Sequence, residues 1–271
     1  NRIGTFGMFA TVAEAQKAGL AYDVVDDLTG EKMGRAKSGT FRTADLVGLD
    51  TIGHVMKTMQ DHLQDDPFAA SFATPPAFSA LIAKGALGQK TKGGIYRKDG
   101  KAVLRFDPDK GDYVPAGGKA DETVARILKK KDPAERVKLL RESKNPQARF
   151  VWAVMRDSWH YAACTLQEIA DNARDVDLAM RFGFAMAQGP FEAWQQAGWS
   201  QVATWIRDDI ASGEALANVP LPSWVFDGPV AERGGVHQPE GSWSPARAAF
   251  VPRATPPVVQ RQLFPMTLAG E

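Results

Sequence analysis

Apolar residues recur every three or four positions through most of the chain, which is the spacing of one face of an α-helix. The pattern is clear from the start and predicts a first helix over about residues 2–17. Gly19 follows at the position where helices commonly end in a left-handed conformation, so we expect the helix to stop there. The apolar positions of this first segment are Ile3, Phe6, Phe9 and Ala13.

Further helix boundaries are marked by capping residues and by proline. Asp23, with Asp26 three residues later, predicts a capping box at the start of a second helix. Gly48 interrupts the pattern and Asp50 is expected to cap a longer helix that ends near Leu63. Proline is favoured in the first turn of a helix, so Pro75-Pro76 predicts a short helix over residues 77–84.

The same helical pattern occurs twice along the chain. Four positions of the first copy have a matching residue 150 positions later, without a gap, and Ser200 replaces Asp50 as the second predicted cap. Internal repetition determines architecture, and two copies can cover each other's apolar faces. The sequence therefore predicts two homologous helical domains related by a pseudo-twofold axis. The matching pairs are Asp27 and Asp177, Gly39 and Gly189, Phe41 and Phe191, and Gly48 and Gly198.

The two copies are separated by a segment with a different pattern. Residues 103–106 and 112–114 flank the turn 107–111, which predicts a small β-hairpin. Two charged helices, over residues 121–131 and 133–142, are expected to follow. From Asp227 onward proline and glycine are frequent and periodicity is lost, which is typical of an extended tail or linker. The expected divisions are 1–100 for the first copy, 101–146 for the hairpin and helical linker, 147–225 for the second copy and 226–271 for the tail.

Composition excludes several functional classes. The chain has 271 residues, 44% of them hydrophobic, and a formal net charge of +1, which gives no general attraction to nucleic acid or anionic lipid. No apolar run approaches the roughly 18–20 residues that cross a bilayer. The single cysteine, Cys164, excludes an internal disulfide and fits a reducing compartment. We therefore expect a cytoplasmic protein without a membrane span or a nucleic-acid partner.

No motif in the chain forms an active site by itself. Residues 85–91 contain glycines, a lysine and a threonine, but their spacing differs from that of a phosphate-binding loop. No glycine-rich turn follows a hydrophobic strand, so a dinucleotide site is not predicted within the chain. His54 and His62 are eight residues apart, which does not match the spacing of a metal-binding pair on one helix, and no metal site is expected. No nucleophile-elbow pattern supports a Ser-His-Asp triad.

Two segments nevertheless resemble a known family. Residues 34–50, GRAKSGTFRTADLVGLD, resemble the glycine-proline-phenylalanine and glycine-leucine-aspartate block of 3-hydroxyacyl-CoA dehydrogenase C-terminal domains. Residues 87–96, LGQKTKGGIY, resemble the lysine-threonine segment that closes that domain, and the second copy is similar to the degenerate one in multifunctional β-oxidation proteins. Ala36, Thr40 and Ile95 depart from the family pattern.

The resemblance implies an all-α fold of the 6-phosphogluconate dehydrogenase C-terminal type, present as two tandem domains. It implies that NAD, the catalytic histidine and its glutamate partner belong to a preceding Rossmann-type domain. Asn1-Arg2 matches the pair that opens the first C-terminal helix in the family, so Asn1 is the implied active-site residue. Since the chain starts with asparagine inside a helical pattern, we expect it to be a piece of a longer polypeptide.

The implied substrate is an acyl-CoA, and this chain would form one wall of its cleft. Lys37, Ser38 and Arg42 are the candidate substrate-binding residues, although capping or surface roles are an equal alternative. An enoyl-CoA hydratase domain is the implied downstream partner. Two other functions stay open at this point: a non-catalytic helical scaffold, and the helical domain of a different hydroxy-acid dehydrogenase.

Overall fold

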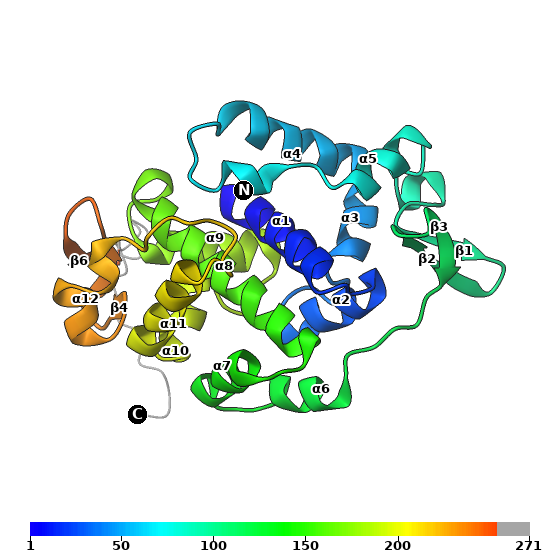
Figure 1. Ribbon diagram of the computed structural model, residues 1–271. Coiled ribbons are helices and arrows are strands. Elements are labelled where there is room, and N and C mark those ends of the chain that lie inside the picture. Colours follow the sequence, from blue (N-terminus) through cyan, green and yellow to red (C-terminus); the bar gives the residue numbers. More distant parts are fainter. Residues whose placement is uncertain (254–271) are drawn as a thin grey trace, which may run out of the picture.

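The computed structural model describes residues 1–253 and is built mainly from helices (Figure 1). The part of the expected tail that comprises residues 254–271 lies outside the described residues. The first copy contains five α-helices, which follow one another and then give way to a small sheet. These are α1 (Arg2–Lys17), α2 (Tyr22–Thr29), α3 (Phe41–Val47), α4 (Leu49–His62) and α5 (Pro76–Ala83).

The ends of α1 and the start of α5 agree with the sequence pattern, but the predicted side-chain caps were wrong. Gly19 has φ +62°, as expected after the end of α1. Asp23 and Asp50 lie inside the first turns of α2 and α4, which begin after Ala21 and Gly48 without a side-chain cap. The carboxylate of Asp23 instead accepts hydrogen bonds from the backbone amides of Gly117 and Gly118. The Asp23 carboxylate, which the local pattern assigned to the start of α2, is therefore bonded to backbone amides from a distant segment.

Ser200 was also predicted wrongly as a cap. Helix α11 (Trp199–Ala211) begins after Gly198, which has φ +96°, and no side chain caps it. The same arrangement occurs at Gly48, with φ +103°, before α4. The two copies therefore share a glycine-led helix start at this point rather than a shared capping side chain.

The segment between the copies contains the predicted hairpin and the two charged helices. The hairpin strands β2 (Ala102–Asp107) and β3 (Asp112–Pro115) pair in antiparallel fashion, and β1 (Tyr96–Asp99) adds a third strand. Helices α6 (Glu122–Leu128) and α7 (Pro133–Glu142) follow. Both helices have side-chain caps, because Asp121 and Asp132 accept hydrogen bonds from the first turns.

The two copies pack on each other through their equivalent long helices, α1 and α8 (Pro146–Ile169). Arg2 at the start of α1 bonds to Glu168 near the end of α8, whereas Glu14 near the end of α1 pairs with Arg156 in the first half of α8. The helices are therefore antiparallel, which is compatible with a pseudo-twofold axis perpendicular to them, and the axis itself stays a prediction. The rest of the second copy comprises α9 (Ala173–Phe184), α10 (Pro190–Gln196) and α11.

The repeat has a one-residue gap that the sequence comparison missed. Backbone amides of Phe41 and Arg42 donate to Asp26, at 2.6 and 3.0 Å. In the second copy the amides of Phe191 and Glu192 donate to Asp177, at 2.9 and 3.1 Å. Asp26, not Asp27, is therefore the structural equivalent of Asp177. Each carboxylate accepts hydrogen bonds from backbone amides at the start of a helix that have no partner within the helix. Because Asp26 and Asp177 make the same bonds, they are the residues to align when the two copies are compared.

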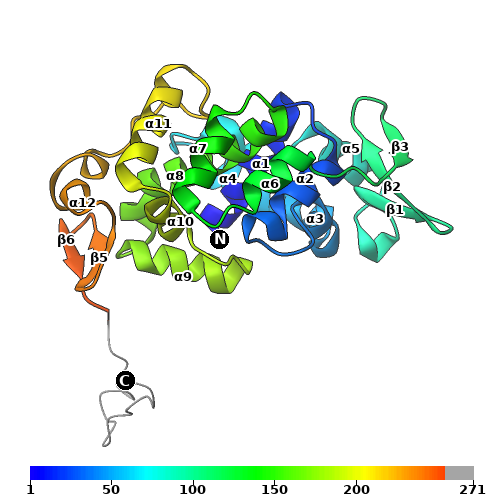
Figure 2. The same cartoon turned by 90° about the horizontal axis from the view of Figure 1, so that it is seen from below.

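Residues 228–251 do not form the extended tail that the sequence suggested. They contain α12 (Gly228–Arg233) and an antiparallel sheet of three strands. This sheet and the sheet β1–β3 lie at opposite ends of the molecule (Figures 1 and 2). The strands of the second sheet are β4 (His237–Gln238), β5 (Gly241–Ser244) and β6 (Ala249–Val251).

The second sheet contacts the second copy in the same way as the first sheet contacts the first copy. Asp45 of α3 accepts the amide of Tyr96, and Gln195 at the matching place in α10 accepts the amide of His237. The Tyr96 hydroxyl donates to Asp26, and Nε2 of His237 lies 2.6 Å from Oδ2 of Asp177. We infer that the second copy extends to residue 251, and that His237 takes the place of Tyr96.

This equivalence predicts the effect of replacing His237. Alanine would leave the buried Asp177 carboxylate without one partner, at a cost of about 1–3 kcal/mol. Tyrosine can donate a hydrogen bond from the same place, so His237→Tyr is expected to lose less than half as much. Urea unfolding of both variants at neutral pH measures this, with the exposed His54→Ala as control. A His237→Ala variant within 0.5 kcal/mol of the original protein would contradict the role of this contact.

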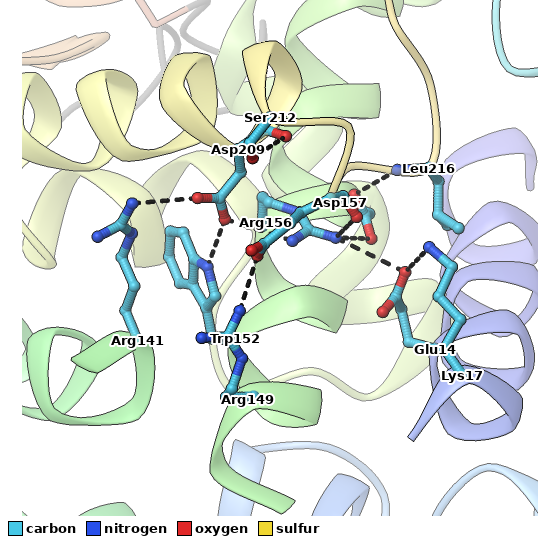
Figure 3. Close-up of polar contacts among 11 residues, drawn as sticks. Glu14, Lys17, Arg141, Arg149, Trp152, Arg156, Asp157, Asp209, Ser212 and Leu216 are labelled. Carbon is cyan, nitrogen blue, oxygen red and sulfur yellow. Dashed lines mark hydrogen bonds and ion pairs between the residues drawn. The ribbon is translucent and has the colours of Figure 1, made fainter. Parts of the chain in front are cut away.

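A buried ionic network joins the copies next to the α1–α8 contact (Figure 3). Arg156 of α8 has a side chain only 2% exposed and forms ion pairs with Asp157, Asp209 and Glu14, at 2.9, 3.3 and 3.6 Å. These carboxylates come from α8, α11 and α1. Because an unpaired charge is costly inside a protein, the guanidinium fixes three helices at one point.

Candidate functional site

The start of α1 is held rigidly by Arg2. Its guanidinium pairs with Asp66 and Glu168, both at 2.6 Å, and Nε donates to the hydroxyl of Tyr161 at 2.9 Å. Burial opposes the charge, but the hydrogen bonds to Glu168, Tyr161 and Asp66 outweigh it and raise the pKa of Arg2. Arg2 therefore ties the first helix of one copy to the last turn of α8 in the other.

Asn1 lies directly before this anchored helix and lines a groove of about 640 Å³ between α1 and α9. Its side chain is exposed and does not cap α1, while its carbonyl accepts the amide of Thr5 at 2.9 Å. The side-chain amide is thus free of helix capping, and an amide can donate to an oxygen without titrating. The groove combines polar side chains with an apolar wall. Its other lining residues are Arg2, Ile3, Ile169, Ala170, Asp171, Asp175, Val176, Ala179, Met180, Gly183 and Phe184.

The three candidate substrate-binding residues lie in a different part of the fold. Lys37 is exposed, whereas the Ser38 hydroxyl lies 2.6 Å from that of Thr43. The guanidinium of Arg42 lies over the ring of Tyr96, 4.3 Å from its centre. None of the three lines the groove at Asn1. Among the interactions within residues 1–253, none connects them to Asn1, so the structure does not bring the predicted site residues together.

Asp26 is the centre of the packing around Arg42. It is buried, and it accepts the Tyr96 hydroxyl at 2.7 Å together with the amides of Phe41 and Arg42. Burial raises the pKa of Asp26 to about 6, although the hydrogen bonds act in the opposite direction. These contacts are internal to the first copy. They therefore give Asp26, Phe41 and Arg42 a structural role that needs no ligand.

The two segments that carry the family resemblance contact each other directly. The carboxylate of Asp45 accepts the amides of Ile95 and Tyr96, at 2.8 and 2.7 Å. Lys90 of the closing segment forms an ion pair with Asp50, at 2.6 Å. A Cβ atom on Gly88 would lie 2.3 Å from the backbone oxygen of Asp45, so only glycine allows this approach. The motifs therefore form one structural unit that closes the first copy.

Sequence reasoning did not identify the residues that carry these contacts. Asp26, Asp45 and Asp177 are acidic residues on otherwise buried helix faces, and each is at most 6% exposed. An aspartate at a position where the helical pattern calls for an apolar residue could have indicated them, since a buried carboxylate needs hydrogen-bond donors. Their partners come from segments up to 70 residues away, which the local pattern does not reveal.

No helix among residues 1–253 is long and apolar enough to cross a membrane.

Comparisons with known proteins agree on one family. Residues 1–98 match the family model of the 3-hydroxyacyl-CoA dehydrogenase C-terminal domain. A probable 3-hydroxyacyl-CoA dehydrogenase of Bacillus subtilis is 36% identical over 227 residues, which cover 83% of this chain and 27% of that protein. A putative trifunctional enzyme of the fatty acid oxidation complex from Rickettsia prowazekii is 22% identical, over 83% of this chain and 30% of that protein. The chain thus spans about a third or less of these relatives.

A solved structure shows the same fold. The crystal structure of 3-hydroxybutyryl-CoA dehydrogenase from Escherichia coli aligns with a TM-score of 0.51 and 16% identity, over 78% of this chain and 55% of that one. Since the identity is low, this likeness concerns the fold alone. The matched residues 1–98 and the similarity to the Bacillus protein lead to one assignment: the chain contains, in residues 1–98, a member of the family of 3-hydroxyacyl-CoA dehydrogenase C-terminal domains.

Proposed function

We propose that this chain is the helical C-terminal part of an NAD-dependent 3-hydroxyacyl-CoA dehydrogenase of fatty-acid β-oxidation. The intact enzyme would oxidise a (3S)-3-hydroxyacyl-CoA to the 3-oxoacyl-CoA in the cytoplasm. The observation that carries the proposal is the 36% identity over 227 residues to a probable enzyme of that name. NAD, bound by a preceding Rossmann-type domain, would supply the oxidising power of the reaction. Within residues 1–253 both sheets are small and antiparallel, so the dinucleotide site is assigned to that other domain.

In this proposal Asn1 interacts with the 3-oxygen of the substrate. Its amide stands at the end of a groove with an apolar wall, where a donor can stabilise charge that develops on oxygen during the reaction. Arg2 is then a positioning residue, because its bonds to Asp66, Tyr161 and Glu168 fix the helix that follows Asn1. Lys37, Ser38 and Arg42 would line the acyl-CoA cleft, and Lys37 and Arg42 are exposed.

The full-length protein provides the direct test. NADH formation from a 3-hydroxyacyl-CoA should fall roughly 10²–10³-fold in kcat on Asn1→Ala, the scale of losing one preorganised donor. Lys101→Ala, in the turn between β1 and β2, is the matched surface control and should leave activity unchanged. A kcat within threefold of the original for Asn1→Ala would remove Asn1 from the mechanism.

Two further measurements separate the alternatives. A protein that oxidises free 3-hydroxybutyrate but not its CoA thioester would be a different hydroxy-acid dehydrogenase. A full-length protein inactive on both would favour the scaffold role. The present chain alone is expected neither to bind NAD nor to oxidise substrate, and a micromolar dissociation constant for NAD in a calorimetric titration would contradict this. An enoyl-CoA hydratase domain in the same polypeptide is a further part of the proposal, supported by the names of the trifunctional relatives.

A further inference from the structure

A second cavity, of about 260 Å³, lies between the two copies and does not include Asn1. We call it the junction cavity. It is bounded by α1, α7, α8, α9 and α10 and by the two loops that meet where the amide of Ala187 donates to the carbonyl of Gly34, at 2.7 Å. Both copies thus contribute to its wall, and neither copy encloses it alone.

Much of the wall is apolar and adaptable. Four methionines line it: Met155 and Met180 from α-helices, Met33 from the 3-10 helix Glu31–Met33, and Met186 from a loop. Methionine is flexible and polarisable, so it follows the shape of a variable apolar guest. A purely apolar cavity of this size can stay empty of water and accept hydrocarbon, as a 150 Å³ cavity accepts benzene.

Gly7 shows that the space is not filled by the protein. This residue is buried in the middle of α1 and lines the junction cavity. A Cβ atom placed on it would meet nothing within 4 Å. Glycine is among the least favourable residues inside a helix, yet nothing packs against this position to require it. The missing side chain keeps the cavity open.

Positive charge lines the same cavity without an equal negative charge. Lys32, Arg35 and Arg136 belong to its wall, and no carboxylate does. Lys32 is neutralised by Asp27 at 2.8 Å. Within residues 1–253, no carboxylate comes within 4 Å of the guanidinium of Arg35 or of Arg136, and Arg136 donates only to the carbonyl of Lys130. Burial lowers the pKa of Arg35 to about 10, so it remains charged at neutral pH.

We propose that the junction cavity binds a medium-length acyl chain whose anionic head lies against Arg35 and Arg136. An apolar interior next to unpaired guanidinium groups is complementary to such an amphiphile, because each guanidinium can form charge-assisted hydrogen bonds to a carboxylate or phosphate. The volume of about 260 Å³ corresponds to roughly nine groups the size of a water molecule, which suits the nine carbons that follow the carboxylate in decanoate. The head is the carboxylate of a free fatty acid, because the long pantetheine arm of a CoA thioester would keep its phosphates away from the cavity that holds the acyl chain.

The site goes beyond the proposed dehydrogenase function and can be tested without it. Calorimetric titration of the present chain uses decanoate, decanoyl-CoA, decanol and CoA as probes, with no NAD or preceding domain. Decanoate should bind once per chain and more tightly than decanol. Absence of saturable decanoate binding overturns the proposal, as does binding of decanoyl-CoA or CoA in preference to decanoate.

Variants locate the binding. Arg35→Gln should weaken decanoate at least tenfold and decanol less than twofold, since only the charged head contacts the guanidinium. Gly7→Leu should abolish binding of both, because it fills the cavity from α1. Gly7→Ala is a milder filling that favours the helix and should weaken binding several-fold. Arg247→Gln, on an exposed turn, is the matched control and should bind as the original chain does.

Two outcomes would count against the location. If Gly7→Leu and Gly7→Ala both retain the original affinity while folded, the ligand lies elsewhere. If Arg247→Gln weakens decanoate as much as Arg35→Gln does, the effect is one of general surface charge. Loss of dehydrogenase activity in the full-length protein would bear only on the proposed function, since these titrations measure no turnover.

Discussion

Arg156→Ala is expected to lower the free energy of unfolding of the chain by about 3–5 kcal/mol. The substitution removes the guanidinium that Asp157, Asp209 and Glu14 share in the interior. All three carboxylates are at most 6% exposed. Burial already raises the pKa of Asp157 despite the attraction of Arg156. Breaking a buried ion pair on one side costs about 3–5 kcal/mol, against a total stability of roughly 5–15 kcal/mol for a typical domain.

Urea unfolding monitored by circular dichroism measures this loss. The control is Arg149→Ala, which removes an exposed ion pair with Glu214, with side chains 51% and 47% exposed. Exposed pairs contribute at most about 1 kcal/mol, so the control should remain folded. Arg156→Lys keeps the charge but loses the planar fork and should fall between the two. An Arg156→Ala variant within 1 kcal/mol of the original would show that the network does not hold the copies together.

Gly39→Ala is expected to have the second largest effect. Gly39 has φ +69°, and a Cβ atom there would lie 2.6 Å from the Cα atom of Asp26. Gly19 has nearly the same φ, +62°, but its Cβ atom would meet nothing within 4 Å. Gly19→Ala should therefore lose only the cost of left-handed backbone, about 1–2 kcal/mol. Gly39→Ala should lose at least about 2 kcal/mol more, because backbone atoms of α2 must move.

The second copy offers an independent check of the same contact. Gly189 has φ −74°, which any residue adopts, but its Cβ atom would lie 2.3 Å from the Cα atom of Asp177. Gly189→Ala thus isolates the steric cost and should destabilise by more than Gly19→Ala. Thermal unfolding midpoints of the three variants provide the comparison. Equal losses for Gly39→Ala and Gly19→Ala would mean that the approach to Asp26 is not tight.

Both predictions concern contacts that the sequence pattern located only in part. The repeat drew attention to Gly39 and Gly189 as a matching pair. The tight contact at each glycine is with the backbone of an aspartate in the same copy, which the sequence pattern did not indicate. The sequence pattern did not indicate a role for Arg156. The pattern in its helix comes from the apolar positions, and ion pairs between helices far apart in the chain produce no periodic pattern.

The C-terminal segment shows why no secondary structure was predicted after residue 225. Strands β4 to β6 have two to four residues each, too short for an alternating pattern to be recognised. Their place is set by Gln195 and Asp177, which receive His237 from 42 and 60 residues away. The first sheet was easier to predict, since a five-residue turn with proline and glycine marks its hairpin.

Helical periodicity and terminal glycines were enough to predict most of the helices and their order, because each depends on neighbours within a few turns. The organisation as two homologous copies stays a prediction from the repeat. Resemblance in residues 34–50 and 87–96 added the family. Tertiary structure alone decided which carboxylates serve which amides, the one-residue gap at Asp26, the second sheet and the junction cavity. The physical reason is that a buried charge or an orphan amide accepts any partner that folding brings within about 3 Å, however far away it lies in the chain.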